Sequence, residues 1–156
     1  MAIEKVKEYL KQFGADTKVQ EFAVSSATVE LAAEALGCEP QRIAKTMSFK
    51  IGGDAILIVC AGDVKIDNAK FKAQFGTKAV MLKYDEVEPL VGHAVGGVCP
   101  FAVNDGAAVY LDESLKRFET VFPACGSANS AIELTIAELQ DYSGYKKWVD
   151  VTKPRM

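Results

Sequence analysis

The chain has 156 residues, of which 49% are hydrophobic and 25% charged, and its formal net charge is −3. This length and composition are typical of one globular domain and exclude disordered and fibrous proteins. No apolar run approaches the roughly 20 residues that span a bilayer, and the first residues lack the apolar stretch of a signal peptide. We therefore expect a cytoplasmic protein that forms a single domain over residues 1–156.

Helical spacing marks the N-terminal segment, where Ile3, Val6, Leu10 and Phe13 repeat and Gly14 follows as a stop. Three short elements are expected next: a strand over residues 19–23, a helix that begins near residues 25–28 and ends before Gly37, and a helical turn from Pro40.

The clearest strand signal follows these elements. Met47, Phe49 and Ile51 alternate with polar residues, and the Gly-Gly-Asp sequence at residues 52–54 predicts a hairpin turn. The second strand of this hairpin, over residues 55–60, is apolar at every position, so we expect it in the centre of a sheet.

Short elements separated by capping residues make up the rest of the chain. Asp67 is expected to cap a helix over residues 68–75, and Thr135 with Glu138 fits a capping box for a helix that runs to Tyr142. A further helix is expected near residues 85–91, and Asp112 is expected to cap another. Strands are expected over residues 78–82, 107–111, 120–123, 131–135 and 147–151. Strands and helices interleave without a strict βαβ order, which predicts an α+β fold with a mixed sheet.

The net charge conceals one basic stretch. Between residues 42 and 83, eight basic residues stand against three acidic ones, which gives this stretch a charge of +5. The basic residues are Arg42, Lys45, Lys50, Lys65, Lys70, Lys72, Lys78 and Lys83. We expect them to share one face around a cleft; a solvated exterior of mixed charge is the alternative.

Histidine and cysteine usage restricts the possible chemistry. His93 is the single histidine, and the four cysteines never form a C-x-x-C pair, so neither a metal nor a cofactor is expected. Buried, reduced thiols are the simplest interpretation of Cys38, Cys60, Cys99 and Cys125.

The loop over residues 92–101, with the sequence GHAVGGVCPF, is the most informative segment. Gly96 and Gly97 would let the backbone approach a ligand and direct N–H groups at an oxyanion, a carboxylate or a phosphate. A tight crossing beneath a helix is the alternative explanation of the glycines. Cys99 follows His93 by six residues and allows thiol chemistry, against the simpler interpretation of a small buried residue and a loop histidine.

Three polar residues outside this loop are further candidates. Lys45 opens the alternating strand and can project into a cleft to bind a phosphate or carboxylate, although many such lysines are solvated strand ends. Asp63 follows the buried strand and could lie at the rim of the same cleft. Ser127 could hydrogen-bond a substrate or a water, but it lacks the G-x-S-x-G context of a nucleophile.

These motifs together resemble those of the YbaK/EbsC family, the aminoacyl-tRNA editing domain that is also found inserted in, or associated with, prolyl-tRNA synthetases. The matching segments are IAKTM at residues 43–47, AGDVKID at residues 61–67, the loop at residues 92–101, and residues 126–134. The resemblance extends roughly from residue 19 to residue 152. It implies a single α+β domain with a strongly curved mixed sheet surrounded by helices.

The resemblance also implies an activity: hydrolysis in trans of the ester between a wrong amino acid and tRNA, of the Cys-tRNA(Pro) or Ala-tRNA(Pro) type, with a bound water and backbone donors. Lys45 matches the functional lysine of the family, and Gly96 and Gly97 match its pocket loop. The substrate-binding residues that it implies are Phe22, Thr46, Asp63, Gly92, His93, Val98, Pro100, Gly126 and Ser127. The expected partners are the acceptor end of mischarged tRNA and a synthetase such as prolyl-tRNA synthetase, with no membrane and no metal.

Two positions depart from the family pattern. Ala124 and Ala131 stand where some members carry a serine and an acidic residue. This departure motivates an alternative from another class, a non-catalytic module that binds tRNA or a synthetase. A hydrolase or thiol enzyme that uses Cys99 is a third possibility.

Overall fold

The structure is a computed structural model that describes residues 2–155. Its strands are β1 (Gln20–Glu21), β2 (Ile43–Ile51), β3 (Asp54–Ala61), β4 (Val64–Ile66), β5 (Ala108–Asp112), β6 (Thr120–Pro123), β7 (Ser130–Ala131), β8 (Leu134–Thr135), β9 (Trp148–Val149) and β10 (Thr152–Pro154). Its α-helices are α1 (Ala2–Leu10), α2 (Val29–Leu36), α3 (Asn68–Phe75), α4 (Tyr84–Val91) and α5 (Ile136–Ser143). Four short 3₁₀ helices join these elements within the described residues: Lys11–Phe13, Asp16–Lys18, Pro40–Arg42 and Glu113–Arg117.

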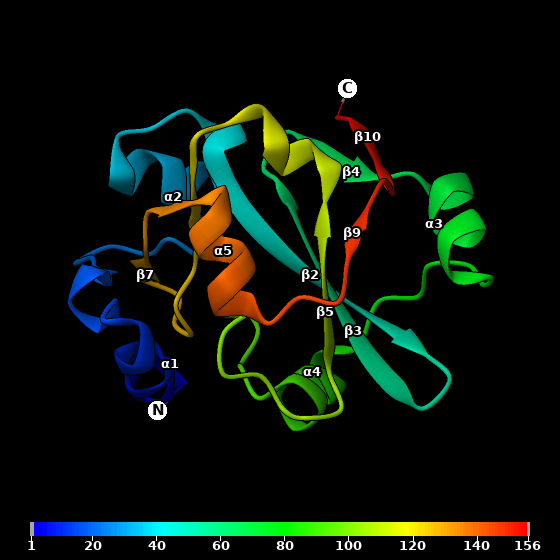
Figure 1. The fold of residues 1–156 in the computed structure, drawn as a ribbon, viewed down its shortest axis with the longest axis horizontal. Helices are drawn as coiled ribbons and strands as arrows, with labels where there is room; N and C mark the ends of the chain where they lie inside the picture. The colour runs from blue at the N-terminus through cyan, green and yellow to red at the C-terminus, as the bar shows by residue number, and fades with distance from the viewer. Residues whose placement is uncertain (1, 156) are drawn as a thin grey trace.

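The strands of the described chain form one large sheet and two small ladders. The large sheet has the order β8-β6-β2-β3-β5-β9, and β1–β7 and β4–β10 are the two-stranded ladders. Antiparallel pairs (β2–β3 and β6–β8) and parallel pairs (β2–β6, β3–β5 and β5–β9) occur in the same sheet. The sheet is strongly curled, and helices lie around it on several sides (Figure 1). This confirms the α+β fold with a curved mixed sheet.

Capping residues set the helix boundaries as the sequence predicts. Thr28 accepts a hydrogen bond from the N–H of Leu31 at the start of α2, and Asp67 accepts from the N–H groups of Ala69 and Lys70 at the start of α3. Thr135 and Glu138 form the capping box of α5. These local hydrogen bonds satisfy the free N–H groups of each first turn, which explains why short helices are stable at these positions.

The centre of the fold is β3. Leu57 and Val59 lie in one buried apolar cluster, whereas Ile56 and Ile58 lie in a second cluster with Phe71 on the other face of the sheet. Side chains alternate between the faces of a strand, so a strand buried on both faces must be apolar throughout. The prediction of a central strand is confirmed.

The short strands are where the sequence-based predictions are wrong. The strand expected over residues 19–23 contains only β1, and residues 78–82 form a single bridge between Met81 and Phe49 instead of a strand. The strand expected over residues 131–135 divides into β7 and β8, which belong to different sheets. The sequence pattern does not predict β4 or β10, because a strand of three residues is too short to show a periodicity.

A buried carboxylate holds the end of β5 against the C-terminal segment. Asp112 accepts hydrogen bonds from the N–H of Val151 (3.0 Å), the N–H of Ser114 (3.0 Å) and the hydroxyl of Thr152 (2.7 Å). Its side chain is completely buried.

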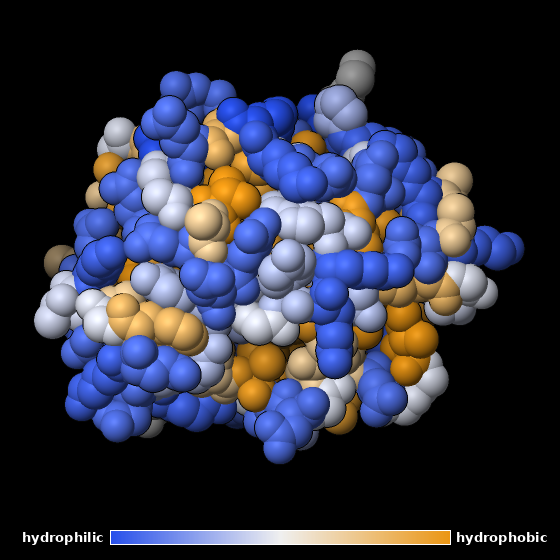
Figure 2. Space-filling model, viewed as in Figure 1, coloured by the Kyte–Doolittle hydropathy of each residue, from blue (hydrophilic) through white to orange (hydrophobic). Residues whose placement is uncertain are grey.

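The four cysteines are free, and three of them are buried, as expected, whereas Cys38 is half-buried. On the face drawn in Figure 2, hydrophilic residues predominate and apolar surface is divided into separate patches.

Candidate functional site

A cavity of about 510 Å³ lies beside β2. Six consecutive residues of this strand, from Ile43 to Ser48, line it. Successive side chains of a strand point to opposite faces, so a cavity that contacts all six must lie along the edge of the strand and not on one face of the sheet. The remaining walls come from α2 and the segment before it, from residues 81–87 and 95–98, from the end of β6 and from β7.

The cavity occupies a gap in the large sheet. On this edge of β2, β6 pairs only with Ile43 and Ala44. Farther along the strand, the N–H of Leu82 donates to Ser48 (3.2 Å), and the N–H of Lys50 donates to the carbonyl of Val80 (2.8 Å). Between these two neighbours, the edge of β2 faces the cavity.

Lys45 supplies the one charged side chain among the described residues that line the cavity. It is half-buried, and its ammonium donates a hydrogen bond to the backbone carbonyl of Val64 in β4. This hydrogen bond holds the ammonium group of Lys45 beside the cavity, where its remaining N–H groups can bind an anionic or polar group.

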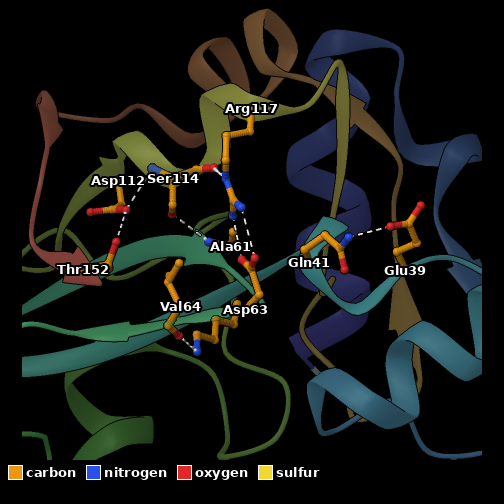
Figure 3. A network of polar contacts seen from close by, with 10 residues as sticks. Glu39, Gln41, Ala61, Asp63, Val64, Asp112, Ser114, Arg117 and Thr152 are labelled. Atoms are coloured by element: carbon orange, nitrogen blue, oxygen red, sulfur yellow. Dashed lines mark hydrogen bonds and ion pairs between the residues drawn. The ribbon is translucent and has the colours of Figure 1, made fainter. Parts of the chain in front are cut away.

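Figure 3 shows a polar network near Val64, the residue whose carbonyl accepts the hydrogen bond from Lys45. Arg117 binds Asp63 through two hydrogen bonds of 2.6 and 3.0 Å, and the Arg117 guanidinium holds the pKa of that carboxyl below its usual range. The hydroxyl of Ser114 accepts from the N–H of Ala61, 3.1 Å away. Asp63 therefore does not line the cavity; it ties the β3–β4 connection to the 3₁₀ helix at Glu113–Arg117.

The cavity walls are mostly small or apolar. Sequence reasoning did not assign most of these residues to the site, because they are ordinary core types that carry no chemical signal. The apolar members outside β2 are Ala27, Val29, Ala32, Met81, Leu82, Val87, Val95, Val98, Phe122, Ala124 and Ala131. Hydroxyl groups come from Ser26, Thr28, Thr46, Ser48, Tyr84 and Ser130. The two positions that depart from the family pattern, Ala124 and Ala131, thus lie in the cavity wall itself.

The glycine loop divides between lining the cavity and supporting it. Gly96 and Val98 line the cavity, and Gly96 has a φ of 95°. Gly97 does not line it, and its N–H donates to the carbonyl of Ala94 at 3.0 Å. The N–H of Gly97, which the sequence predicts to be a catalytic donor, thus already has a partner within the loop.

Gly97 instead allows two loops to cross. A Cβ at this position would lie 2.7 Å from the backbone nitrogen of Ser127 and 2.8 Å from the carbonyl carbon of Gly126. The hydroxyl of Ser127 donates to Ser130 Oγ at 2.7 Å, and Ser130 lines the cavity. Gly126 and Ser127 thus support the wall without being part of it.

Phe22, Gly92 and Pro100, three more of the predicted substrate-binding residues, do not line this cavity. The N–H of Phe22 donates to the carbonyl of Asn129 (2.8 Å). Gly92 ends α4 with a φ of 99°. Pro100 lines a second, more polar cavity together with Lys5, Tyr9 and Asn104. Of the twelve predicted site residues, the structure brings four to the main cavity: Lys45, Thr46, Gly96 and Val98.

His93 and Cys99 are completely buried and belong to the core. The ring Nε2 of His93 lies 2.7 Å from the carbonyl oxygen of Phe101 and 3.5 Å from the sulfur of Cys99. Burial lowers the pKa of His93 and raises the pKa of the Cys99 thiol to about 12. A neutral thiol that lines neither cavity is a poor nucleophile. The geometry therefore does not support an enzyme that uses Cys99.

The basic stretch does not gather around the cavity. Lys45 is the one member of the stretch that lines it. Arg42, Lys50 and Lys70 instead pair with Glu133, Glu86 and Asp150, respectively. These observations do not support one basic face around the cleft, and a mixed-charge exterior describes the three paired residues better.

Residues 2–155 contain no group of three or more histidine, cysteine, aspartate or glutamate side chains that could hold a metal ion. No helix within that range is long and apolar enough to cross a membrane.

Comparisons with known proteins place this geometry in context. The sequence profile of the aminoacyl-tRNA editing domain family matches residues 24–142. The uncharacterized protein YwhH of Bacillus subtilis (strain 168) is 54% identical over 154 residues, which cover 98% of both chains. The proline–tRNA ligase of Bacillus cytotoxicus is 27% identical over 124 residues, which make up 78% of this chain but only 22% of the ligase.

Solved structures show the same similarity. One, described provisionally as a trans-editing enzyme for prolyl tRNA synthetase, is 29% identical, with a TM-score of 0.87 and 97% of each chain covered. The hypothetical protein APE2540 is 27% identical, with a TM-score of 0.84, 96% of this chain and 99% of that one being covered.

Proposed function

The chain belongs to the aminoacyl-tRNA editing domain family, and we propose that it is a free-standing hydrolase that removes alanine or cysteine from mischarged tRNA(Pro). The observation that carries this proposal is the cavity beside β2, in which a single cation stands among small apolar walls and hydroxyl groups. Its substrate would be the acceptor end of a charged tRNA in the cytoplasm, and a prolyl-tRNA synthetase is the proposed partner that produces the mischarged species.

The contents of the cavity support a water-based mechanism. Among the described lining residues there is no carboxylate, imidazole or thiol that could act as nucleophile or general base. An aminoacyl ester is already activated, so a positioned water, backbone donors and the neighbouring ribose hydroxyl of the substrate suffice. Lys45 would hold the terminal nucleotide through its charge, and Gly96 and Val98 would limit the room for the amino acid.

The small walls support a small amino acid. Ala32, Ala124 and Ala131 leave space close to the edge of β2, where bulkier residues would fill it. Discrimination by pocket size alone is limited, since one methylene group changes binding by about 1–3 kcal/mol. A second site that removes misplaced small residues from tRNA(Pro) is therefore chemically useful.

A panel of charged tRNAs tests the proposal. Purified protein is incubated with tRNA(Pro) carrying radiolabelled alanine, cysteine, serine, threonine or proline, and with correctly charged tRNA(Ala) and tRNA(Cys). We expect release of alanine or cysteine from tRNA(Pro), whereas Pro-tRNA(Pro) survives. Binding of tRNA without any release would favour the non-catalytic module that the alanines at positions 124 and 131 suggested. Equal hydrolysis of Pro-tRNA(Pro) would contradict an editing role.

A further inference from the structure

The direction of the backbone groups in β2 follows from its pairing. Ile51 and Asp54 face each other across the two-residue hairpin turn, and β2 pairs with β3 from there to Ala44. The carbonyl of Ser48 and the N–H of Lys50 point away from β3, since they bond to Leu82 and Val80. Backbone groups in a strand alternate between its two edges, so the N–H and C=O of Thr46 also point away from β3.

The backbone of Thr46 has no partner on that edge. It lies between Ala44, the last residue of β2 that pairs with β6, and Ser48, which bonds to Leu82. Neither its N–H nor its C=O forms a hydrogen bond with another residue in the range 2–155 on this edge. Its hydroxyl is also buried and unpartnered within that range.

Such an arrangement points to a ligand with matching groups. The Thr46 hydroxyl is buried, and polar groups that face a cavity without a protein partner are normally bound by water or by a ligand. The cavity wall here consists of consecutive β2 residues on both sides of Thr46, so a molecule in the cavity lies directly against the open edge.

We propose that the backbone of Thr46 pairs with the aminoacyl group of the substrate, in the way that two opposed residues pair in antiparallel strands. The substrate must therefore carry a free α-amino group. This inference rests on the proposed function. In an antiparallel pair, two opposed residues exchange both of their N–H···O=C bonds. An aminoacyl ester offers the same groups on either side of its Cα: an ammonium donor and a carbonyl acceptor. The carbonyl of Thr46 accepts from the ammonium, and the N–H of Thr46 donates to the ester carbonyl.

This pairing gives the N–H of Thr46 a part in the reaction. Water adds to the ester carbon, and the carbonyl oxygen becomes an oxyanion that accepts a stronger hydrogen bond from Thr46. The bond between the carbon and the ribose oxygen then breaks. The ribose oxygen takes up a proton, and the products are the free amino acid, with its carboxyl ionised, the tRNA hydroxyl and one released proton. Removal of one such donor from other enzymes lowers kcat by about 10²–10³-fold.

The pairing also predicts which esters are excluded. An acyl group on the α-nitrogen removes its positive charge and places extra atoms against the carbonyl of Thr46. Peptidyl-tRNA and formylated aminoacyl-tRNA would therefore be poor substrates, whatever their side chain.

Substrate variants test the acceptor half of the pair. Ala-tRNA(Pro), its N-acetyl derivative and the lactyl-tRNA(Pro) made by deamination are compared in kcat/KM. We expect losses of at least about tenfold for the lactyl ester, in which a neutral hydroxyl replaces the charged donor, and a larger loss for the acetylated ester. Equal rates for the three esters would overturn the inference.

A backbone variant tests the donor half. Incorporation of the α-hydroxy analogue of threonine at position 46 replaces the N–H with an ester oxygen and keeps the side chain. We expect kcat to fall by about 10²–10³-fold with an unchanged circular dichroism spectrum. The matched control places the α-hydroxy analogue of lysine at position 78. Lys78 is exposed, lies outside the cavity, and its N–H forms no hydrogen bond with described residues. If position 46 behaves like position 78, the N–H of Thr46 has no such role.

Binding separates this inference from the proposed function. The probe is an adenosine whose 3′-alanyl group is attached through a stable amide, and the readout is the ¹⁵N–¹H spectrum. We expect the Thr46 amide resonance to shift on titration, and the des-amino (propionyl) analogue to bind at least about tenfold more weakly. This result would support the inference even if no tRNA were hydrolysed. Tight binding of both analogues, or no shift at Thr46, would overturn it even if hydrolysis were observed.

Discussion

Gly97 packs against the backbone of Ser127 so closely that a Cβ on Gly97 would lie 2.7 Å from the Ser127 nitrogen. This contact joins two loops that are about 30 residues apart in the sequence and positions Gly96 and Ser130 on the cavity wall.

Substitution of Gly97 tests this crossing. Gly97→Ala forces the two backbones apart, and we expect it to lower the free energy of unfolding by about 1–3 kcal/mol and to reduce deacylation. Urea denaturation and release of labelled alanine measure the two effects. Gly106→Ala is the control, because a Cβ there meets no atom within 4 Å. Equal stability of the two variants would show that the loops separate without cost.

Removal of the cation tests the role of Lys45. In Lys45→Ala the substrate loses a charge-assisted contact, so we expect kcat/KM for Ala-tRNA(Pro) to fall by about 10- to 100-fold. The circular dichroism spectrum should not change. Lys72→Ala, at an exposed position of α3, should keep wild-type kinetics. An unchanged rate in Lys45→Ala would remove this lysine from the mechanism.

The thiols should differ sharply in reactivity. Burial raises the pKa of Cys60 and of Cys99 to about 12, and it also raises the pKa of Cys125. These three should remain protonated and unlabelled by Ellman's reagent at pH 8 until the protein unfolds. Cys38, which is half-buried, should react in the native protein.

The thiol variants provide the check on these labelling results. Cys38→Ser should abolish native labelling, and Cys99→Ser should keep deacylase activity. Loss of deacylase activity in Cys99→Ser with an intact fold would support a mechanism in which the Cys99 thiol takes part.

His93 should make the protein sensitive to mild acid. Burial lowers its pKa in the folded state, so the unfolded chain takes up a proton at a higher pH, near the ordinary value of about 6.5. The contribution of His93 to the free energy of unfolding should be constant above that pH and fall as the pH decreases from about 6.5 towards the lowered folded pKa.

Urea titrations at pH 7.5, 6.5 and 5.5 measure this slope. His93→Gln should be less stable at pH 7.5, because the contact with Phe101 changes, yet it should lose the slope between pH 6.5 and 5.5. The carboxyl groups titrate mainly below this range. A slope that persists in the variant would have another origin.

Asp112 should be essential for stability. Asp112→Ala leaves two N–H groups and one hydroxyl without their acceptor in a buried environment. We expect a loss of about 3–5 kcal/mol in the free energy of unfolding, because each buried unsatisfied group costs about 1–3 kcal/mol and neighbouring losses are not additive. Asp105→Ala, at an exposed position, is the matched control.

The sequence predicts those parts of the fold that depend on hydrogen bonds between residues close together in the chain. Thr28, Asp67 and Thr135 fix helix ends through hydrogen bonds to residues two or three positions away, so the spacing alone predicts them. The pairing of β4 with β10 joins segments more than 80 residues apart, and nothing in Val64–Ile66 indicates its partner.

The same distinction applies to the cavity. Lys45 and Gly96 are unusual residues in their contexts, so the sequence alone makes both of them candidates, and both line the cavity. The open edge at Thr46 depends on where β6 stops and where residues 80–82 begin to pair, which is a property of the tertiary structure. The sequence also predicts Gly97 and His93 as site residues, but Gly97 lies where two loops cross and His93 is buried in the core.

The carbonyl that holds Lys45 belongs to β4, whose strand partner in the described chain is β10, at Thr152–Pro154. The position of the Lys45 cation beside the cavity therefore depends on a strand pair that joins residues more than 80 positions apart along the chain.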